Sequence, residues 1–589
     1  MNKLNSSKLI NFAVLMLTLI IGFVVYLYPM KNISLGYDTW WIFSIQSSTK
    51  NLTFPIFYNY IGIEPGNIVS SGIALFDYFG RISFLDWARF WFLSKIFANN
   101  PLIWRSVAVL AMSISLFYWV RIYRILSISK LSICIVYIIL LSDPQSLWLD
   151  WNKSESLAFL FFSIASYYYL SHKKSGKYFS CSMLIIALLI KETFIIAIPF
   201  LIFIRTYKFN NFSTNSFHSR ITYYVNENKF LLIVGFLYSI IVLIMLLFID
   251  PIKSYVMSSR SMDLSDFFYS MFKLLIPIQF HVLITKVTIL LALVTFIFFY
   301  LSKKIVSKIC NLTIKNEALN NITTAKLEIF IFPLLSIVGL TIILFVFGSV
   351  ERRYASPLNI IVITTSILLY SVFKNFASES VRNKQIAEYL DFFVYLLLVF
   401  PFFILVSKIS FYLAAVLLLV FLICFLFFKS KKYVYFAIII LFVVPSLDRT
   451  IISITSSNDI YKSWDAINTE IITSIPQNSI IEINLSDQLN IEQAISLEVN
   501  SILNNRGDIM FFVDGNKSNQ ILTFDENDYW HINKYNLGKD IDPDNQNYIL
   551  SLQVLENSKK NPLPMNFNII FERYNIYKNR YMYAITKSN

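Results

Sequence analysis

Four groups of acidic, basic and aromatic residues interrupt the long apolar stretches of this sequence. A carboxylate held beside aromatic rings at a dry boundary can have a raised pKa and act as a general base, or it can bind a cation together with other oxygens. Arg and Lys side chains bind phosphate oxygens through charge-assisted hydrogen bonds. The residues with this chemistry are Asp38, Asp143, Asp150, Glu155, Lys191, Glu192, Arg352, Arg353 and Tyr354.

Each group also has an explanation without chemistry. Asp38 is compatible with an ordinary loop acid, and Glu155 with an acid that favours a helix N-terminus through the helix dipole. Lys191 and Glu192 are compatible with a tight turn in which the two charges pair with each other. The arginine pair at 352–353 is compatible with side chains that reach lipid headgroups. The functional interpretation therefore depends on whether all four groups face the same compartment.

The composition is that of a polytopic α-helical membrane protein. The 589 residues have a mean hydropathy of +0.59 and are 56% hydrophobic, which is more apolar surface than a soluble core of this size can bury. The 55 Phe and 35 Tyr residues are typical of spans with aromatic flanks. The four cysteines lie outside the polar C-terminal region, so no disulfide framework is predicted there.

Long apolar runs, and shorter runs that are paired, predict about thirteen membrane-spanning helices. The predicted spans are 9–29, 102–120, 129–142, 155–171, 178–190, 193–205, 229–249, 282–301, 328–348, 357–373, 390–406, 409–428 and 433–446.

Lys and Arg are concentrated in alternate connections between these spans, for example 121–130, 172–178 and 205–229. This bias predicts that those connections and the N-terminus are cytoplasmic. All four chemical groups, together with Arg105 and the C-terminal region, then fall on the opposite side. The net charge of +14 belongs to the cytoplasmic connections, because residues from 459 onward hold 17 acidic against 11 basic side chains. A nucleic-acid partner is therefore not expected.

Residues 1–446 are predicted to form the transmembrane core. Its outer connection, 30–101, contains an aromatic-rich helical pattern over 83–98 that favours a helix in the membrane interface or a cap over the bundle. Residues 447–589 are predicted to form a soluble α/β domain, with helices over 459–475 and 489–503. The predicted strands are Ile480–Leu485, Ile509–Val513, Tyr548–Leu552, Ile569–Tyr574 and Tyr581–Thr586.

At these residues the chain resembles the GT-C class of membrane glycosyltransferases, which includes the protein O-mannosyltransferases and the lipid A aminoarabinose transferases. The shared features are an acid just after the first span, acids in the second outer connection, Lys-Glu-Thr at 191–193 and Arg-Tyr-x-x-Pro at 353–357. The first-loop acid is single rather than an Asp-Glu pair, and the C-terminal region lacks a Trp-Trp-Asp motif. Protein N-glycosylation is therefore disfavoured.

The resemblance implies an inverting transfer of a sugar from a polyprenyl-phosphate donor to a surface-glycan or lipid-linked acceptor, such as O-antigen. The composition, with many Ile, Asn, Lys and Phe residues, suggests a bacterial inner membrane, so the reaction would take place on its periplasmic side. Asp38 would be the catalytic base, and Asp143, Asp150 and Glu155 would position the acceptor or a cation. The residues that would hold the donor phosphate are Lys191, Arg352, Arg353, Tyr354 and Arg105.

The cofactor expectation is limited to a divalent cation bound by Asp and Glu side chains. The chain has four His without paired spacing and no Gly-rich nucleotide loop. An O-antigen polymerase or ligase is one alternative, although those enzymes usually place their large outer loop between late spans. A polysaccharide or lipid transporter is another, and it would need ionisable or broken-helix sites near the middle of the bilayer.

Overall fold

The computed structural model describes the chain in separate stretches. They are residues 2–30, 84–97, 100–128, 130–141, 148, 155–171, 173–209, 217–248, 329–346, 360–369 and 371–372, followed by 469, 472–473, 477, 480–484, 506, 509–513, 547–555, 569–574 and 580–587. The chain divides into two compact units. One comprises residues 1–26, 107–243 and 262–453, and the other comprises 27–106, 244–261 and 454–589.

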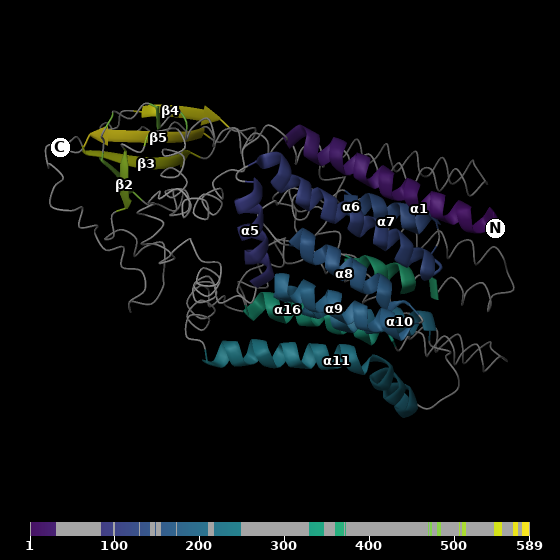
Figure 1. Ribbon diagram of the computed structural model, residues 1–589. Coiled ribbons are helices and arrows are strands. Elements are labelled where there is room, and N and C mark those ends of the chain that lie inside the picture. The colour runs from purple at the N-terminus through teal and green to yellow at the C-terminus, as the bar shows by residue number, and fades with distance from the viewer. Residues whose placement is uncertain are drawn as a thin grey trace, which may run out of the picture. The chain divides into compact units, whose positions relative to one another are not determined.

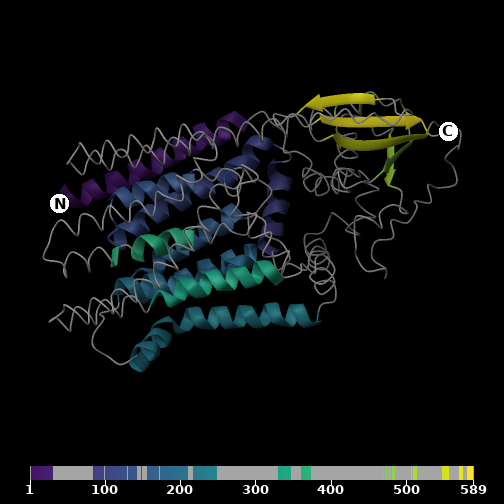
Figure 2. The same cartoon turned by 180° about the vertical axis from the view of Figure 1, so that it is seen from behind.

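Most of the described helices belong wholly or largely to the first unit (Figure 1). They are α1 (Asn2–Ile21), the π-helical turn η1 (Gly22–Leu27), α6 (Pro101–Ile125), α7 (Lys130–Leu141), α8 (Glu155–Tyr169), α9 (Lys174–Ile190), the 3-10 turn η5 (Glu192–Ile196), α10 (Ala197–Phe209), α11 (Phe217–Phe248) and α16 (Ile331–Val346). A shorter apolar helix covers Ile360–Leu369. Helices α8, α9, α10 and α16 lie side by side in both opposite views (Figures 1 and 2).

The two ends of α6 follow from local sequence. The side chain of Asn100 accepts hydrogen bonds from the backbone N–H groups of Leu102 and Ile103 at 3.1 and 3.3 Å, and Pro101 occupies the first helical position, where its missing N–H costs nothing. At the other end, Ser127 has a φ of 60°. Its left-handed backbone lets the N–H of Ile128 reach the carbonyl of Tyr123 at 3.0 Å, which ends the helix.

Hydrogen bonds between α1 and α6 show that these helices are antiparallel. The Nη1 atom of Arg124, near the end of α6, donates to Oδ1 of Asn11 at 2.8 Å. Earlier in α6, the hydroxyl of Ser113 donates to the carbonyl of Thr18 at 3.5 Å. Residue numbers therefore increase along one helix as they decrease along the other.

The core of the first unit is aromatic and joins α6 to α8 and α10. Trp119 is 1% exposed and packs its ring against Phe159, Phe162 and Phe200, at centroid distances of 5.7–6.5 Å. Its indole N–H donates to the hydroxyl of Ser163 at 2.9 Å. Large rings supply apolar contact area, and the indole N–H is paired, as a buried donor requires.

Each described helix of the first unit overlaps a predicted span, but α1 begins at Asn2 rather than at 9, and α11 begins at Phe217 rather than at 229. The predicted spans 282–301, 390–406, 409–428 and 433–446 lie outside the described residues. Within the described part of the chain, one helix, Leu102–Ile125, is long and apolar enough to cross a membrane. Its most apolar window is 61% buried in the molecule, and a core helix of a soluble protein meets the same criteria. The membrane setting and the number of spans therefore stay predictions.

The second unit contains helix α5 (Phe84–Phe97), which covers the aromatic-rich segment expected to be helical. Arg89 and Asp86 form an ion pair one turn apart, at 2.8 Å. Phe92 and Ile96 are 55% and 65% exposed, so part of the apolar surface of this helix is not covered by the chain itself. The 3-10 turn η2 (Tyr28–Met30) also belongs to this unit.

The second unit also holds a five-stranded mixed sheet with the strand order β2-β1-β3-β5-β4. The strands are β1 (Ile480–Asn484), β2 (Met510–Val513), β3 (Asn547–Leu555), β4 (Ile569–Tyr574) and β5 (Arg580–Lys587). Strand β1 pairs in parallel with β2 and β3, whereas β5 pairs antiparallel with β3 and β4. Each strand coincides with a strand-like run of the sequence, although β3 is longer than predicted. The predicted helices 459–475 and 489–503 lie almost entirely outside the described residues.

Candidate functional site

Three of the predicted site residues lie in described parts of the chain. They are Arg105, which is buried in the part of α6 that belongs to the second unit, and Glu155 and Lys191 of the first unit. The other predicted site residues lie outside the described residues, namely Asp38, Asp143, Asp150, Arg352, Arg353 and Tyr354. The structure brings Glu155 and Lys191 together.

The chain bends sharply at Lys191. Helix α9 ends at Ile190, because Lys191 has extended backbone angles of φ −150° and ψ 115°. The N–H of Lys191 still bonds to the carbonyl of Ala187 at 2.8 Å, and its own carbonyl accepts from the N–H of Phe194 at 3.2 Å. The 3-10 turn η5 then leads into α10. The break that the charged pair predicted in this apolar stretch is therefore present in the structure.

Helices α9 and α10 are the two arms of a hairpin. Lys177, near the start of α9, and Arg205, near the end of α10, both contact the same carboxyl of Glu227. The start of one helix therefore lies beside the end of the other. Lys191 and η5 form the turn between them, at the opposite end of the hairpin.

A buried ion pair fixes the turn to the start of α8. The Nζ atom of Lys191 lies 3.2 Å from Oε1 of Glu155, and the two side chains are 7% and 1% exposed. Glu155 is the first residue of α8, where the helix dipole also favours a negative charge. Burying two charges is costly unless they pair. The pairing explains how both can lie in an apolar region.

Two polar atoms beside this ion pair have no hydrogen-bond partner among the residues that the structure describes. They are Oε2 of Glu192 and Oγ1 of Thr193, and both are buried. Thr193 as a whole is 3% exposed. We refer to Glu155, Lys191, Glu192 and Thr193 together as the Lys191 turn.

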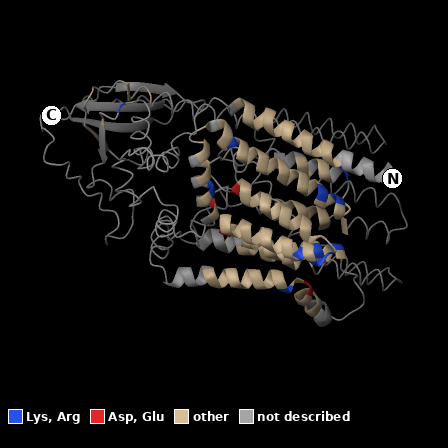
Figure 3. Ribbon diagram, viewed as in Figure 1, with Lys and Arg blue, Asp and Glu red and all other residues tan. Residues whose placement is uncertain are grey.

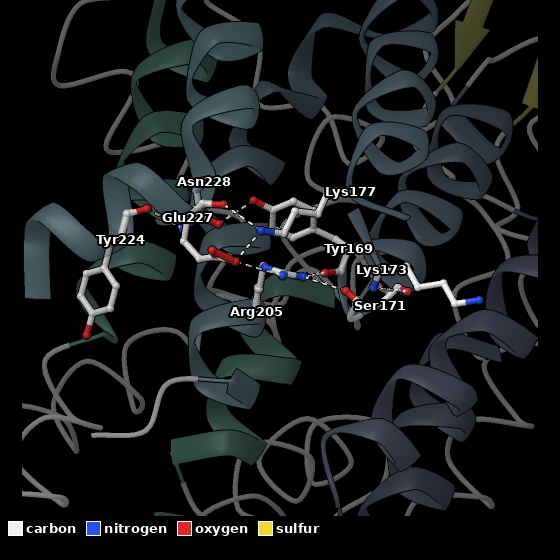
Figure 4. Close-up of polar contacts among 8 residues, drawn as sticks. All are labelled: Tyr169, Ser171, Lys173, Lys177, Arg205, Tyr224, Glu227 and Asn228. Atoms are coloured by element: carbon white, nitrogen blue, oxygen red, sulfur yellow. Dashed lines mark hydrogen bonds and ion pairs between the residues drawn. The ribbon is translucent and has the colours of Figure 1, made fainter. Parts of the chain in front are cut away.

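A second polar group lies at the other end of the same helices (Figure 4). We refer to it as the Glu227 cluster, and its members are Tyr169, Ser171, Lys177, Arg205, Glu227 and Asn228. Oε1 of Glu227 contacts Nζ of Lys177 and lies 3.2 Å from Nη2 of Arg205. Arg205 also donates to the main-chain carbonyls of Tyr169 and Ser171, the latter at 3.1 Å. The guanidinium thus satisfies carbonyls that the end of α8 leaves free.

Amide and hydroxyl groups extend the Glu227 cluster. The hydroxyl of Tyr169 donates to Oδ1 of Asn228 at 2.5 Å, and Nδ2 of Asn228 donates to the carbonyl of Tyr224 at 2.7 Å. The cluster thereby joins α8, α9, α10 and the first part of α11. The role that these contacts indicate for the Glu227 cluster is to hold the four helices together.

The charge of Glu227 is stabilised by its two cations. Burial acts to raise the pKa of this carboxyl, but hydrogen bonds and charge from Lys177 and Arg205 together outweigh it and hold the pKa below its ordinary value. Glu227 is therefore ionised at neutral pH. Its carboxyl already contacts Lys177 and Arg205, so a ligand would have to compete with these two cations for it.

The basic residues of several helices gather at the Glu227 end. Arg121 of α6 bonds to the hydroxyl of Tyr167, two residues before the end of α8. Helices α9 and α10 show their basic residues toward this end of the bundle, whereas α6 has Arg121 and Arg124 here and Arg105 near its other end (Figure 3). The connections 121–130, 172–178 and 205–229, which the charge bias assigns to one compartment, are thus flanked by helix ends that lie together. The Lys191 turn lies at the opposite end.

The sequence did not single out Glu227 or Asn228. Lys177 and Arg205 were interpreted as charges that set topology, and that interpretation does not predict their shared partner. The available signal was local: an acid and an amide, Glu227 and Asn228, come directly before an apolar run. A polar pair at that position is compatible with an anchor for the cations of neighbouring helices.

Within the described residues, no group of three or more His, Cys, Asp or Glu side chains lies close enough to hold a metal ion. The divalent cation stays a prediction that depends on Asp38, Asp143 and Asp150. Comparison with known protein families, with curated proteins and with solved structures finds no match for this chain.

Proposed function

We propose that the chain is an inverting glycosyltransferase embedded in a bacterial inner membrane. It would transfer a sugar from a polyprenyl-phosphate donor to a surface-glycan or lipid-linked acceptor on the periplasmic side. The proposal rests on the ordered motifs of the sequence. The observation that supports it best is the buried ion pair of Lys191 with Glu155 in a turn between two apolar helices.

A cation buried at a helix turn is unusual for a purely structural connection. A hairpin between apolar helices needs only polar or small residues, and burying Lys191 requires a buried acid to compensate it. Phosphate is a better-matched anion for an ammonium group at headgroup depth, since it offers several charged oxygens. We therefore assign Lys191 to the donor phosphate and assign Glu155 the role of positioning its ammonium group.

The remaining roles follow the motif order. Asp38 removes the proton of the acceptor hydroxyl as the sugar bond forms. The leaving phosphate gains negative charge, which cations already in place stabilise. Asp143 and Asp150 position the acceptor or a cation. In addition to Lys191, the residues assigned to the donor phosphate are Arg105, Arg352, Arg353 and Tyr354.

The geometry of the Lys191 turn does not favour the alternative function of a transporter. Transporter sites are commonly built where a single membrane helix is interrupted near the middle of the bilayer. At Lys191 the chain instead reverses direction, because α9 and α10 are antiparallel. The buried ion pair thus belongs to the ends of helices rather than to their middle.

The assignment of Asp38 can be tested on surface glycans. Wild type, a deletion strain, and stably inserted Asp38→Asn and Asp86→Asn variants are compared by mass spectrometry of their glycans. We expect the deletion and Asp38→Asn to lose the same sugar. Asp86 pairs with Arg89 in the same outer connection and serves as the matched control. An Asp38→Asn strain with the wild-type glycan, where the deletion lacks one sugar, would rule out the base assignment.

The orientation can be tested separately. A reporter that is active only in the periplasm is fused after Asn589, and a second copy is fused in the connection 172–178. We expect activity from the first fusion and none from the second. The reverse pattern would place the Lys191 turn in the cytoplasm, away from a periplasmic acceptor.

A further inference from the structure

Two neighbouring residues of the Lys191 turn each carry a buried polar atom that has no partner among the described residues. Oε2 of Glu192 and Oγ1 of Thr193 make no hydrogen bond, and Thr193 is 3% exposed. Thr193 comes directly after Glu192 in η5, and Glu192 comes directly after the ion-paired Lys191. The residues that carry the unmatched atoms therefore follow Lys191 directly in the chain, and we assign Lys191 to the donor phosphate.

Buried polar atoms of folded proteins are nearly always hydrogen-bonded, because an unmatched one costs free energy. A ligand that forms hydrogen bonds with both atoms would explain why they are unmatched in the ligand-free protein. The free-energy cost of leaving them without hydrogen bonds is then offset when the ligand binds.

We propose that Glu192 and Thr193 bind hydroxyl groups of the sugar carried by the lipid-phosphate donor. This inference rests on the proposed glycosyltransferase function and adds a sugar subsite beside its phosphate site. An ionised carboxylate can only accept hydrogen bonds, whereas the Thr193 hydroxyl can both donate and accept. Adjacent hydroxyls of a sugar ring match this pair, because one donates to Glu192 while its neighbour exchanges a hydrogen bond with Thr193.

A divalent cation fits this position less well than a neutral hydroxyl. The ammonium group of Lys191 lies next in sequence and already neutralises Glu155 at 3.2 Å. The described residues offer no third acid here to complete a cation site. A neutral hydroxyl needs only hydrogen bonds, which the carboxylate of Glu192 and the hydroxyl of Thr193 can supply.

The test measures how much the sugar adds to binding. The full chain is purified in lipid nanodiscs, and its affinity is measured for undecaprenyl phosphate and for undecaprenyl phosphate carrying glucose, galactose, mannose or aminoarabinose. We expect at least one glycosylated lipid to bind wild type more tightly than undecaprenyl phosphate itself. In Glu192→Gln and in Thr193→Val we expect this gain to fall about tenfold, as for the loss of a hydrogen bond to a charged or buried group.

Controls separate the subsite from folding and from phosphate binding. Undecaprenyl phosphate should bind both variants within about twofold of wild type, and Thr193→Ser, which keeps the hydroxyl, should retain most of the gain. Wild-type gain in both variants would overturn the inference, and so would a wild type that binds all lipids equally. A Mg²⁺-dependent affinity that Glu192→Gln abolishes would show a cation site instead. Failure of undecaprenyl phosphate to bind wild type at all would contradict the proposed function itself.

Discussion

The Lys191 turn and the Glu227 cluster are built from similar residues at opposite ends of the same helices, yet they differ in how well their polar atoms are matched. Glu227 contacts two cations, and Arg205 reaches two main-chain carbonyls in addition. The Lys191 turn pairs Lys191 with Glu155 but leaves Glu192 Oε2 and Thr193 Oγ1 without partners among the described residues. In the Glu227 cluster the Nε atom of Arg205 also lacks a hydrogen bond within the described part of the chain, although both Nη atoms of the same guanidinium are bonded.

This difference distinguishes a site that stabilises the fold from a site prepared for a ligand. A polar cluster with most of its hydrogen bonds made rigidifies the helices that carry it. Unmatched polar atoms cost stability, and they are retained where function requires them. The two ends of one helix bundle thus allow stability and function to be tested separately.

The largest expected effect is on the buried ion pair. Lys191→Met would remove the ammonium group that pairs with the Glu155 carboxylate, which is 1% exposed. We expect the free energy of unfolding to fall by about 3–5 kcal/mol, as for other buried pairs that lose one partner. The matched variant Lys177→Met leaves Glu227 bound to Arg205 and about a third exposed, so its cost should be about 1 kcal/mol.

Both variants are measured by SDS titration of the purified protein in mixed micelles. The decisive quantity is the difference between them. Equal losses for Lys191→Met and Lys177→Met would mean that the two ion pairs are equally exposed to solvent in solution, and the contrast in burial would be wrong.

A somewhat smaller loss is expected at the centre of the Glu227 cluster. Arg205→Met removes a guanidinium that binds Glu227 and the carbonyls of Tyr169 and Ser171. We expect the free energy of unfolding to fall by about 2–4 kcal/mol, because the two carbonyls lose their hydrogen-bond donor. Surface-glycan composition per folded molecule should not change. A variant of wild-type stability that alters the glycan would instead give the cluster a direct role in the reaction.

The helices and strands could be predicted from the sequence because their signals are local. Apolar runs and alternation located α6, α8 and all five strands to within a few residues. The break at Lys191 was visible for the same reason, since two charges in an apolar run cannot face lipid. Local patterns determine where an element begins and ends, and they require no knowledge of its neighbours.

The partners of the charged residues could not be predicted in this way. Glu155 and Lys191 are separated by 35 intervening residues, and pairing Lys191 with its neighbour Glu192 was an equally simple expectation. Which acid a buried cation meets depends on how α8 packs against the hairpin of α9 and α10. The unmatched atoms of Glu192 and Thr193 are a property of that packing, for which sequence spacing gives no signal.

The Glu227 cluster should also give a pH-dependent stability. Its cations hold the pKa of Glu227 below the ordinary value of 4.5. A lowered folded-state pKa contributes stability that is present above the ordinary value and is lost as the pH falls through the folded-state value. We expect wild type to exceed Glu227→Gln by about 1 kcal/mol at pH 7, given the partial exposure of the pair. Denaturation at a series of pH values should show the difference shrink as the pH falls below 4.5 and vanish below the folded-state pKa of Glu227. A difference that stays constant over this range would contradict the prediction.

The smallest expected effects are stability changes of opposite sign at the Lys191 turn and at the Glu227 cluster. Thr193→Val keeps the side-chain shape and removes a buried hydroxyl that has no partner among the described residues, so the ligand-free protein should become more stable by about 0.5 kcal/mol. Tyr169→Phe removes a hydroxyl that donates to Asn228 at 2.5 Å, so it should become less stable by about 1 kcal/mol. Both are measured without ligand in the same mixed micelles. If Thr193→Val is also destabilising, its hydroxyl is already matched in the folded protein, and the turn would be as complete as the Glu227 cluster.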